Sequence, residues 1–248
     1  GMQVDRLHAR RAFDAYTAAY DSADPKIRLK IDHTYRVADL CDRIARSMTE
    51  NADDVGLAWL CGLLHDIGRF EQVRRYGTFK DAESVSHAAL GAGILFGAQG
   101  VIRRFVRDDD QDALIRAAVA RHSDYRLPTE LDECTRRFCN VVRDADKIDI
   151  VKVNCIGPVQ AIYDVSEAEL AESPVSPQAL AGFAEHRTLA RGERMYPADY
   201  VVGHICFAFE LAYPESRRIM RQQGYLGQML ARPFSNVQTA AAFAHMRM

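Results

Sequence analysis

Hydrophobic residues recur at steps of three and four positions over most of the chain, which is the spacing of one face of an α-helix. The segment "LKIDHTYRVADLCDRIARSM", residues 29–48, shows this spacing most clearly. The alternation of apolar and polar residues that marks half-buried strands is almost absent. The pattern therefore predicts an all-α fold. The inward positions of this first helix are His33, Val37, Cys41, Ile44 and Met48.

Capping residues and helix breakers indicate where the next elements begin and end. A helix is predicted over residues 52–66, with Asn51 as its N-cap and Gly68 as the residue that stops it. Residues 70–85 are polar and charged, which favours a loop. Further helices are predicted at 86–97 with Ser86 as the cap, at 111–122 behind the acidic run 108–110 as a capped and solvated start, and at 130–151.

Helical spacing continues beyond Gly157 and Pro158. We interpret the chain as a single all-α domain over residues 1–248, with a first part up to about residue 156 and a C-terminal helical part at about 157–248 that packs onto it. The C-terminal helices are expected at about residues 159–171, 177–189, 198–212, 215–223 and 232–246.

Composition limits the class of protein. The 248 residues are 48% hydrophobic, enough for a substantial core, and the formal charge of −2 gives no general attraction to nucleic acid. No signal region and no apolar run of about 18 residues is visible behind Gly1, which resembles an expression scar, so we expect a soluble, cytoplasmic protein with no membrane partner. The six cysteines form no CxxC pair and mostly lie among apolar neighbours, which is typical of reduced, buried thiols in an intracellular protein.

Histidines and aspartates occupy helical faces that are otherwise apolar. His122 shares its face with Leu114 and Val119, and Asp146 follows Val142 by four positions. Burying an imidazole or a carboxylate alone costs on the order of several kcal/mol, although a single buried histidine is most simply satisfied by a backbone carbonyl. A set spread over four or five successive helices favours a shared cation instead. That set is His33, His65, Asp66, His87, His122 and Asp146.

His65 and Asp66 stand side by side in "LLHDIGRF" at the end of the second predicted helix. Adjacent helical residues diverge by about 100°, so both reach one point only from the last turn, beyond the helix end. The exposed carbonyls of that turn carry roughly half a negative charge, which also favours a cation. Imidazole together with carboxylate suits a divalent transition metal such as Fe, Mn, Co, Zn or Ni better than Ca or Mg alone.

The ordered set H…HD…D, with the local motifs "HDIGR" and "RDADKID", resembles the HD-domain superfamily of metal-dependent phosphohydrolases over about residues 28–152. The resemblance implies an HD-domain-like helical bundle with additional C-terminal helices. Members with two further histidines between HD and the last aspartate hold two metal ions. Carried over residue by residue, this implies that His33, His65 and Asp146 bind one ion, that His87 and His122 bind the other, and that Asp66 bridges them.

The same resemblance implies a dinuclear enzyme that hydrolyses a phosphomonoester or phosphodiester, nucleotide esters included, by metal-activated water. Asp66 would serve catalysis, and the partner would be a small phosphorylated substrate. Arg69 and Lys147 follow ligands closely and are candidates for catalysis and for binding the substrate phosphate; alternatively, they pair with acids such as Asp144. Asp149 would orient a ligand histidine or serve as a helix-end charge, and His204 is interpreted as a satisfied core residue.

Two other functions stay open at this point. Some superfamily members that share these ligands hold a mixed-valent di-iron centre and oxidise inositol or organophosphonates with O₂, and ligand types alone do not separate the two chemistries. A non-catalytic, metal-bound sensor module is the third alternative, against which the intact ligand set argues. No motif for covalent catalysis is present. A homo-oligomer is compatible with this sequence.

Overall fold

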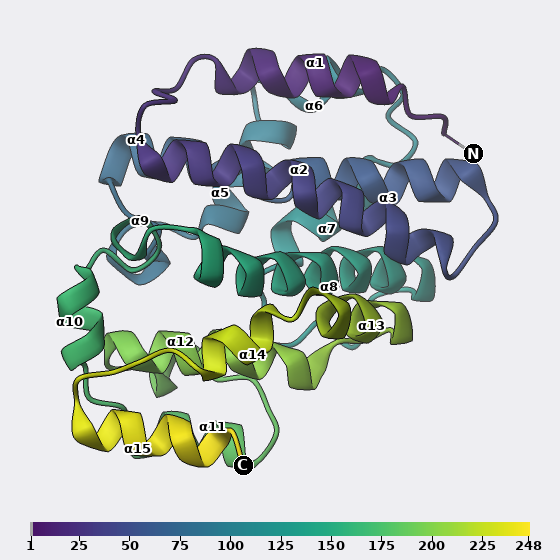
Figure 1. Ribbon diagram of the computed structural model, residues 1–248. Helices are drawn as coiled ribbons and strands as arrows, with labels where there is room; N and C mark the ends of the chain where they lie inside the picture. The colour runs from purple at the N-terminus through teal and green to yellow at the C-terminus, as the bar shows by residue number, and fades with distance from the viewer. Residues whose placement is uncertain (1) are drawn as a thin grey trace. The chain divides into compact units, whose positions relative to one another are not determined.

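Helices account for the regular structure throughout residues 2–248, the part of the chain that the computed structural model describes (Figure 1). No strand occurs within these residues, so the all-α prediction is confirmed. The remark on Gly1 lies outside the described residues. None of the helices in the described range is long and apolar enough to cross a membrane.

The chain divides into two compact units, one ending at Asp146 and the other spanning Lys147–Met248. The interpretation of both units as one domain stays a prediction. All six predicted ligand residues lie in the first unit.

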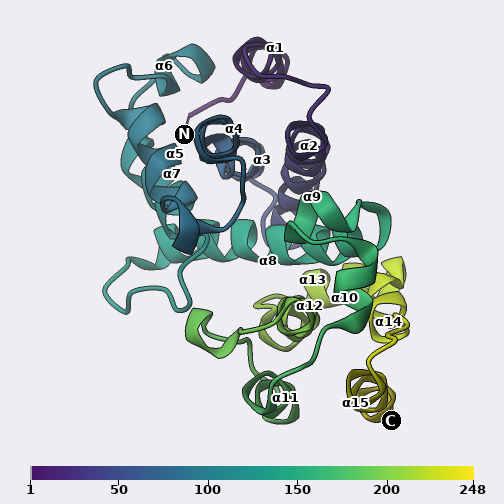
Figure 2. The ribbon, with the colours of Figure 1, turned by 90° about the vertical axis from the view of Figure 1, so that its left-hand side faces the viewer.

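Helices α2 and α3 of the first unit lie side by side, as Figure 1 and Figure 2 both show. Helix α2 spans Pro25–Arg46 and begins at Asp24, whose carboxylate accepts a hydrogen bond from the backbone N–H of Lys26. Helix α3 spans Ala52–Leu64, and the side chain of Asn51 caps it as predicted. Both helices therefore begin where a side chain satisfies amides that the first turn leaves without partners.

The predicted inward face of α2 is confirmed except at its end. His33, Val37, Cys41 and Ile44 are fully buried. Met48 was expected on the same face, but it is 39% exposed. The expectation is wrong there because the helix has already ended and Met48 lies in the following turn.

The structure also corrects the expectation for residues 67–85. Helix α3 stops at Leu64, and a new helix, α4, spans Ile67–Tyr76, so Gly68 lies inside α4 and residues 70–76 are helical. A short 3-10 helix, η1, follows at Asp81–Glu83. The two helices α3 and α4 are thus joined by only two residues, His65 and Asp66.

Gly68 allows α4 to pack backbone to backbone on α5, which spans His87–Phe96. A Cβ atom at position 68 would lie 2.2 Å from the carbonyl oxygen of His87 and 2.6 Å from the backbone nitrogen of Gly91. The predicted Ser86 cap of α5 is confirmed, since its hydroxyl accepts from the N–H of Ala89. The small residues of both helices therefore bring the start of α5 next to the start of α4.

The acidic run 108–110 is exposed, as expected, but it does not cap the next helix, because Gln111 stands at the N-cap position. Helix α8 passes the end of α7, where the guanidinium of Arg143 donates to the carbonyls of Arg121 and Asp124. The remaining elements of the first unit are α1 (Arg6–Thr17), α6 (Ile102–Phe105), α7 (Asp112–Arg121) and the part of α8 (Glu133–Ile156) up to Asp146.

The second unit contains the rest of α8 and the helices that follow it. The predicted helix at 159–171 is broken in two, because Asp164 adopts a left-handed conformation with φ 58° and ends α9. Within α12, His204 has hydrogen-bond partners, as expected, with its Nδ1 2.9 Å from both Asn154 Nδ2 and the hydroxyl of Tyr163, but it is half-buried and not a core residue. The elements are α9 (Val159–Tyr163), α10 (Glu167–Glu172), α11 (Pro177–Ala184), η2 (Arg191–Glu193), α12 (Pro197–Cys206), η3 (Phe207–Glu210), α13 (Pro214–Gln223), α14 (Tyr225–Leu230) and α15 (Val237–Met246).

All six cysteines are free thiols, as expected. The expectation that they are buried is confirmed for four of them, whereas Cys155 is half-buried and Cys134 is exposed. The buried four are Cys41, Cys61, Cys139 and Cys206.

Candidate metal centre

The six predicted side chains converge on one place in the first unit. They come from α2, the α3–α4 junction, the start of α5, the end of α7 and the middle of α8. In each of two groups the potential ligand atoms all lie within 4.8 Å of one another. One group is His33, His65, Asp66 and Asp146, and the other is Asp66, His87 and His122.

Asp66 belongs to both groups because of its place in the chain. It stands at the N-cap position of α4, where an aspartate normally accepts a bond from the helix, but its carboxylate makes no capping hydrogen bond. Instead, Oδ2 lies 3.3 Å from Nε2 of both His33 and His65. Oδ1 lies 3.2 Å from Nε2 of His122 and 3.5 Å from Nε2 of His87. One oxygen of Asp66 therefore faces each group.

The first group places two carboxylates around the imidazole of His65. Its Nδ1 lies 2.6 Å from the carbonyl oxygen of Gly62, and since a carbonyl only accepts, Nδ1 carries the proton. Nε2 is fully buried without a hydrogen-bond partner, although oxygens of Asp66 and Asp146 both lie 3.3 Å away. Asp146 Oδ1 also lies 3.0 Å from Nε2 of His33. The lone pairs of these buried imidazole nitrogens and carboxylate oxygens need a positively charged partner, either a proton or a metal ion.

The second group consists of two histidines whose Nε2 atoms face each other at 2.9 Å. His122 donates from Nδ1 to the carbonyl oxygen of Val119 at 2.7 Å, and His87 donates from Nδ1 to Asp81 at 2.8 Å. Both Nε2 atoms therefore carry lone pairs in the neutral rings, and two lone pairs at this distance repel. Burial, followed by the charge of Arg69, lowers the pKa of His87 to about 3, so His87 does not supply a proton at neutral pH. A cation bound to both nitrogens would remove the repulsion between their lone pairs.

The ionisation of each aspartate in the centre depends on the cationic and imidazole groups beside it. Burial by itself would raise the pKa of Asp66, but the charges of His65 and Lys30 outweigh it and hold this pKa well below its usual range. Burial likewise opposes ionisation of Asp146, and the imidazoles of His33 and His65 beside its carboxylate hold its pKa well below the usual value. Both carboxylates are therefore ionised and able to bind a cation at neutral pH.

The spacing of the donor atoms fits a metal ion. Neighbouring ligand atoms about 2.0–2.2 Å from one ion are roughly 2.8–3.6 Å apart in octahedral or tetrahedral geometry. The nitrogen–oxygen separations around Asp66 and Asp146, from 3.0 to 3.5 Å, fall in this range. The buried histidine and aspartate cluster is therefore compatible with divalent metal binding.

Residues 31–150 match the family model described as the HD domain. This part of the chain is an HD domain. The match contains all six residues of the two groups and lies within the range over which the resemblance was expected. HD domains occur mostly in metal-dependent phosphohydrolases, so this domain suggests a metal-dependent, hydrolase-type function in broad terms. Neither a curated protein nor a solved structure matches the chain.

Lys30 is a residue of the candidate metal centre that the sequence analysis missed. Its ammonium lies 2.8 Å from Asp66 Oδ2, and the residue is only 7% exposed. The available signal was its position, because Lys30 precedes His33 by three residues and therefore lies on the same inward face of α2. A lysine on an otherwise apolar, ligand-bearing face requires an acidic partner inside the protein.

Asp81 was missed as well. It accepts from Nδ1 of His87, from Gln72 and from Arg69, and so fixes the ring of His87 with its Nε2 toward Asp66. A carboxylate behind a histidine is the usual support of a metal ligand. Asp81 lies in a segment that the sequence assigned to a loop, with no periodic relation to His87, so the pattern of apolar positions gave no signal for it.

The remaining predicted residues are Arg69, Lys147 and Asp149. Arg69 donates to the carbonyl of Phe79, at 2.6 Å, and pairs with Asp81 at 3.3 Å, so its acidic partner is Asp81. Lys147 opens the second unit, with its ammonium 5.9 Å from the centre of the Phe207 ring. Asp149 is buried in α8. The catalytic and phosphate-binding roles of Arg69 and Lys147, and the orienting role of Asp149, stay predictions.

Metal uptake should depend on pH through His65. Burial lowers the pKa of this histidine, but the nearby carboxylates of Asp66 and Asp146 outweigh burial and raise it to about 9. Below that pH a metal ion has to displace a proton from His65, so affinity should rise by about tenfold per pH unit between about pH 6 and pH 8. Calorimetry in buffers of different ionisation enthalpy measures the released proton. Affinity that falls or stays level over this interval would contradict the assignment.

Replacing Asp81 with asparagine should weaken metal binding by about 10–100-fold, because the ring of His87 loses the carboxylate that orients it. Glu83→Gln is the matched control, since Glu83 lies on the same 3-10 turn with an exposed side chain 4.0 Å from Lys80. Metal affinity measured by competition with a chelating dye compares the two. Equal affinities in both variants would show that Asp81 does not support the site.

Proposed function

We propose that this HD-domain protein is a dinuclear metal phosphohydrolase that cleaves a phosphomonoester or phosphodiester of a small molecule. One observation supports the dinuclear form above the others. The two oxygens of Asp66 face two separate groups of imidazole nitrogens, and the Nε2 atoms of His87 and His122 oppose each other at 2.9 Å. A single cation in the first group would leave this second pair of lone pairs unsatisfied.

The six residues of the two groups would hold two separate metal ions. His33, His65 and Asp146 would hold one ion, His87 and His122 the other, and Asp66 would bridge the two. Divalent ions held this way lower the pKa of a coordinated water and withdraw charge from a phosphoryl oxygen. The hydrogen bonds to Gly62, Val119 and Asp81 keep three Nε2 lone pairs aimed inward.

Activity after metal replacement tests the proposal. The purified protein is stripped with a chelator, reloaded separately with Mn²⁺, Fe²⁺, Co²⁺, Ni²⁺ or Zn²⁺, and assayed with nitrophenyl phosphate, bis-nitrophenyl phosphate and nucleotides. We expect at least one metal to restore hydrolysis, with two ions bound per chain. Absence of hydrolysis with every metal and ester would overturn the proposal.

Further measurements on the same preparation distinguish the phosphohydrolase from the other functions that share these ligands. Iron with a paramagnetic half-reduced signal and substrate-dependent O₂ uptake would indicate a mixed-valent oxygenase. Metal that raises the melting temperature without any turnover would indicate a sensor module. The HD domain and its ordinary association with hydrolysis support the phosphohydrolase over these alternatives.

A further inference from the structure

The motif "RDADKID" supplies the ligand Asp146, but its first residue, Arg143, belongs to neither of the two ligand groups. Arg143 lies on α8 three residues before Asp146, and therefore on the same side of that helix. The residue is only 9% exposed. A buried guanidinium needs hydrogen-bond acceptors inside the protein, so the acceptors that it meets indicate its role.

The acceptors of Arg143 are backbone carbonyls at the end of α7. Its Nη1 donates to the carbonyl oxygens of Asp124, at 2.6 Å, and Arg121, at 3.2 Å. Longer bonds join the guanidinium to the carbonyl oxygens of His122, at 3.4 Å, and Tyr125, at 3.5 Å. The last carbonyls of a helix have no partners within it, and a positive charge beside them is favourable. Arg143 therefore fixes the backbone on both sides of the ligand His122.

His122 is a ligand at the end of its helix. It directly follows the last residue of α7, and residues 122–132 contain no helix. The ligand His33, by contrast, lies well inside the long helix α2. The Nε2 atom of His122 nevertheless has to stay close to Asp66 Oδ1, from which it is 3.2 Å away. The bonds from Arg143 hold the backbone of His122 against α8, and so support this placement.

We propose that Arg143 is a positioning residue for the metal ion that His87 and His122 would hold. This inference rests on the dinuclear centre of the proposed function. Arg143 joins the turn of α8 that carries Asp146 to the backbone of His122, and so sets the distance between a ligand of one ion and a ligand of the other. The first group has four ligands, none with a backbone that Arg143 holds, whereas His122 is one of only three in the second group.

The test is a calorimetric titration of the metal-stripped protein with Mn²⁺, in the unmodified chain and in Arg143→Met. We expect two ions to bind to the unmodified chain. In Arg143→Met the second ion should bind about 10–100-fold more weakly, as when the support of a metal ligand is removed, while the affinity for the first ion stays unchanged. Removal of a positive charge by itself would strengthen the binding of a cation, so the loss of charge does not explain a weaker second ion.

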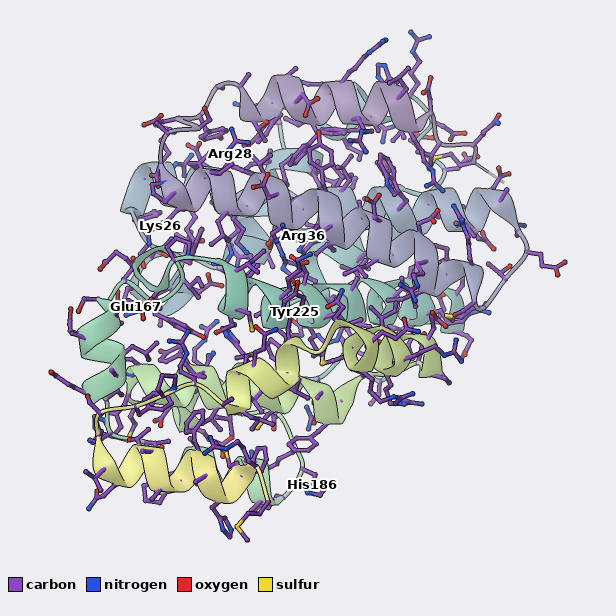
Figure 3. The ribbon with its side chains drawn as sticks, in the orientation of Figure 1. Lys26, Arg28, Arg36, Glu167, His186 and Tyr225 are labelled. Carbon is purple, nitrogen blue, oxygen red and sulfur yellow. The ribbon has the colours of Figure 1, made fainter. Side chains whose placement is uncertain are left out.

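Arg136→Met is the matched control. Arg136 also lies on α8, and its guanidinium donates to the backbone carbonyl of Pro128, which is not next to a ligand in the chain. Arg28→Met controls for the loss of an exposed arginine, since Arg28, labelled near the beginning of α2 in Figure 3, pairs with Asp32. Both variants should bind two ions with unchanged affinities. Circular dichroism verifies that each variant is folded.

Arg143→Lys keeps the charge but replaces the fork of donors with a single ammonium group. It should therefore recover only part of the affinity for the second ion. This variant also keeps the inference testable if Arg143→Met does not fold. A second ion that binds Arg143→Met as tightly as the unmodified protein would overturn the inference. A parallel weakening of both ions would overturn it as well, because it would indicate a purely structural role.

The outcomes also separate this inference from the function on which it rests. Selective weakening of the second ion, without hydrolysis of any ester by the unmodified protein, would support the role of Arg143 and refute the phosphohydrolase. Hydrolysis by the unmodified protein, with a second ion that Arg143→Met leaves unaffected, would support the phosphohydrolase and refute the role of Arg143. A single ion in the unmodified protein would refute the dinuclear centre, and the role of Arg143 with it.

Discussion

Asp66→Asn should reduce hydrolysis by about a thousandfold or more and lower the metal content of the purified protein. The amide keeps the shape of the side chain but removes the negative charge that faces both histidine groups. Stabilisation by bound metal ions is worth several kcal/mol, and each 1.36 kcal/mol corresponds to about tenfold in rate. Elemental analysis together with phosphatase kinetics measures both effects.

Asp42→Asn is the control for this substitution. Asp42 is also a mostly buried aspartate, on α2, but its oxygens pair with Arg6 and Arg46 at 2.8 Å and lie outside both ligand groups. We expect this variant to lose some stability and to keep its metal and its activity. If Asp66→Asn keeps full activity, or if Asp42→Asn loses activity equally, the assigned role of Asp66 is wrong.

Gly68→Ala should destabilise the protein more than an ordinary glycine substitution would suggest. Alanine favours a helix by about 1 kcal/mol over glycine. At position 68, however, the added methyl group would meet backbone atoms of α5, at 2.2 Å and 2.6 Å, which cannot rotate away. Overpacking typically costs about 1–3 kcal/mol, and we expect at least about 3 kcal/mol here, because α4 and α5 have to separate.

Gly93→Ala provides the comparison, since Gly93 lies in α5 and a Cβ there has nothing within 4 Å. It should leave stability unchanged or raise it by up to about 1 kcal/mol. Denaturant unfolding of the two variants measures the difference. The separation in Gly68→Ala should also move His87 away from Asp66 and lower metal content. A stable, fully loaded Gly68→Ala variant would contradict the close packing of α4 on α5.

The helical fold and the convergence of the candidate ligands could be predicted from the sequence, because both depend on periodic apolar faces. His33 and His122 occupy positions where the pattern demands a buried side chain, and the structure buries them. The pair His65 and Asp66 was identified from its position at a helix end. Its true setting, a two-residue junction between α3 and α4, required knowledge of where α3 stops.

Helix α4 was misread as a loop because it buries polar residues. Gln72 is fully buried, where it hydrogen-bonds to Arg69, Asp81 and Ser84. Glu71 is also mostly buried, and it accepts hydrogen bonds from Tyr20 and from arginines of its own helix. A pattern of hydrophobic positions does not register polar side chains that tertiary partners satisfy. Asp81 and Lys30 escaped notice for the same reason.

Anomalous diffraction from crystals loaded with Mn²⁺ tests the central claim most directly, namely that the six side chains bind two metal ions. The account predicts two peaks about 3.5–4 Å apart on either side of the Asp66 carboxylate. His33, His65 and Asp146 should ligate one peak, and His87 and His122 the other. A centre without a peak, or with metal only at the exposed acidic run 108–110, would contradict it.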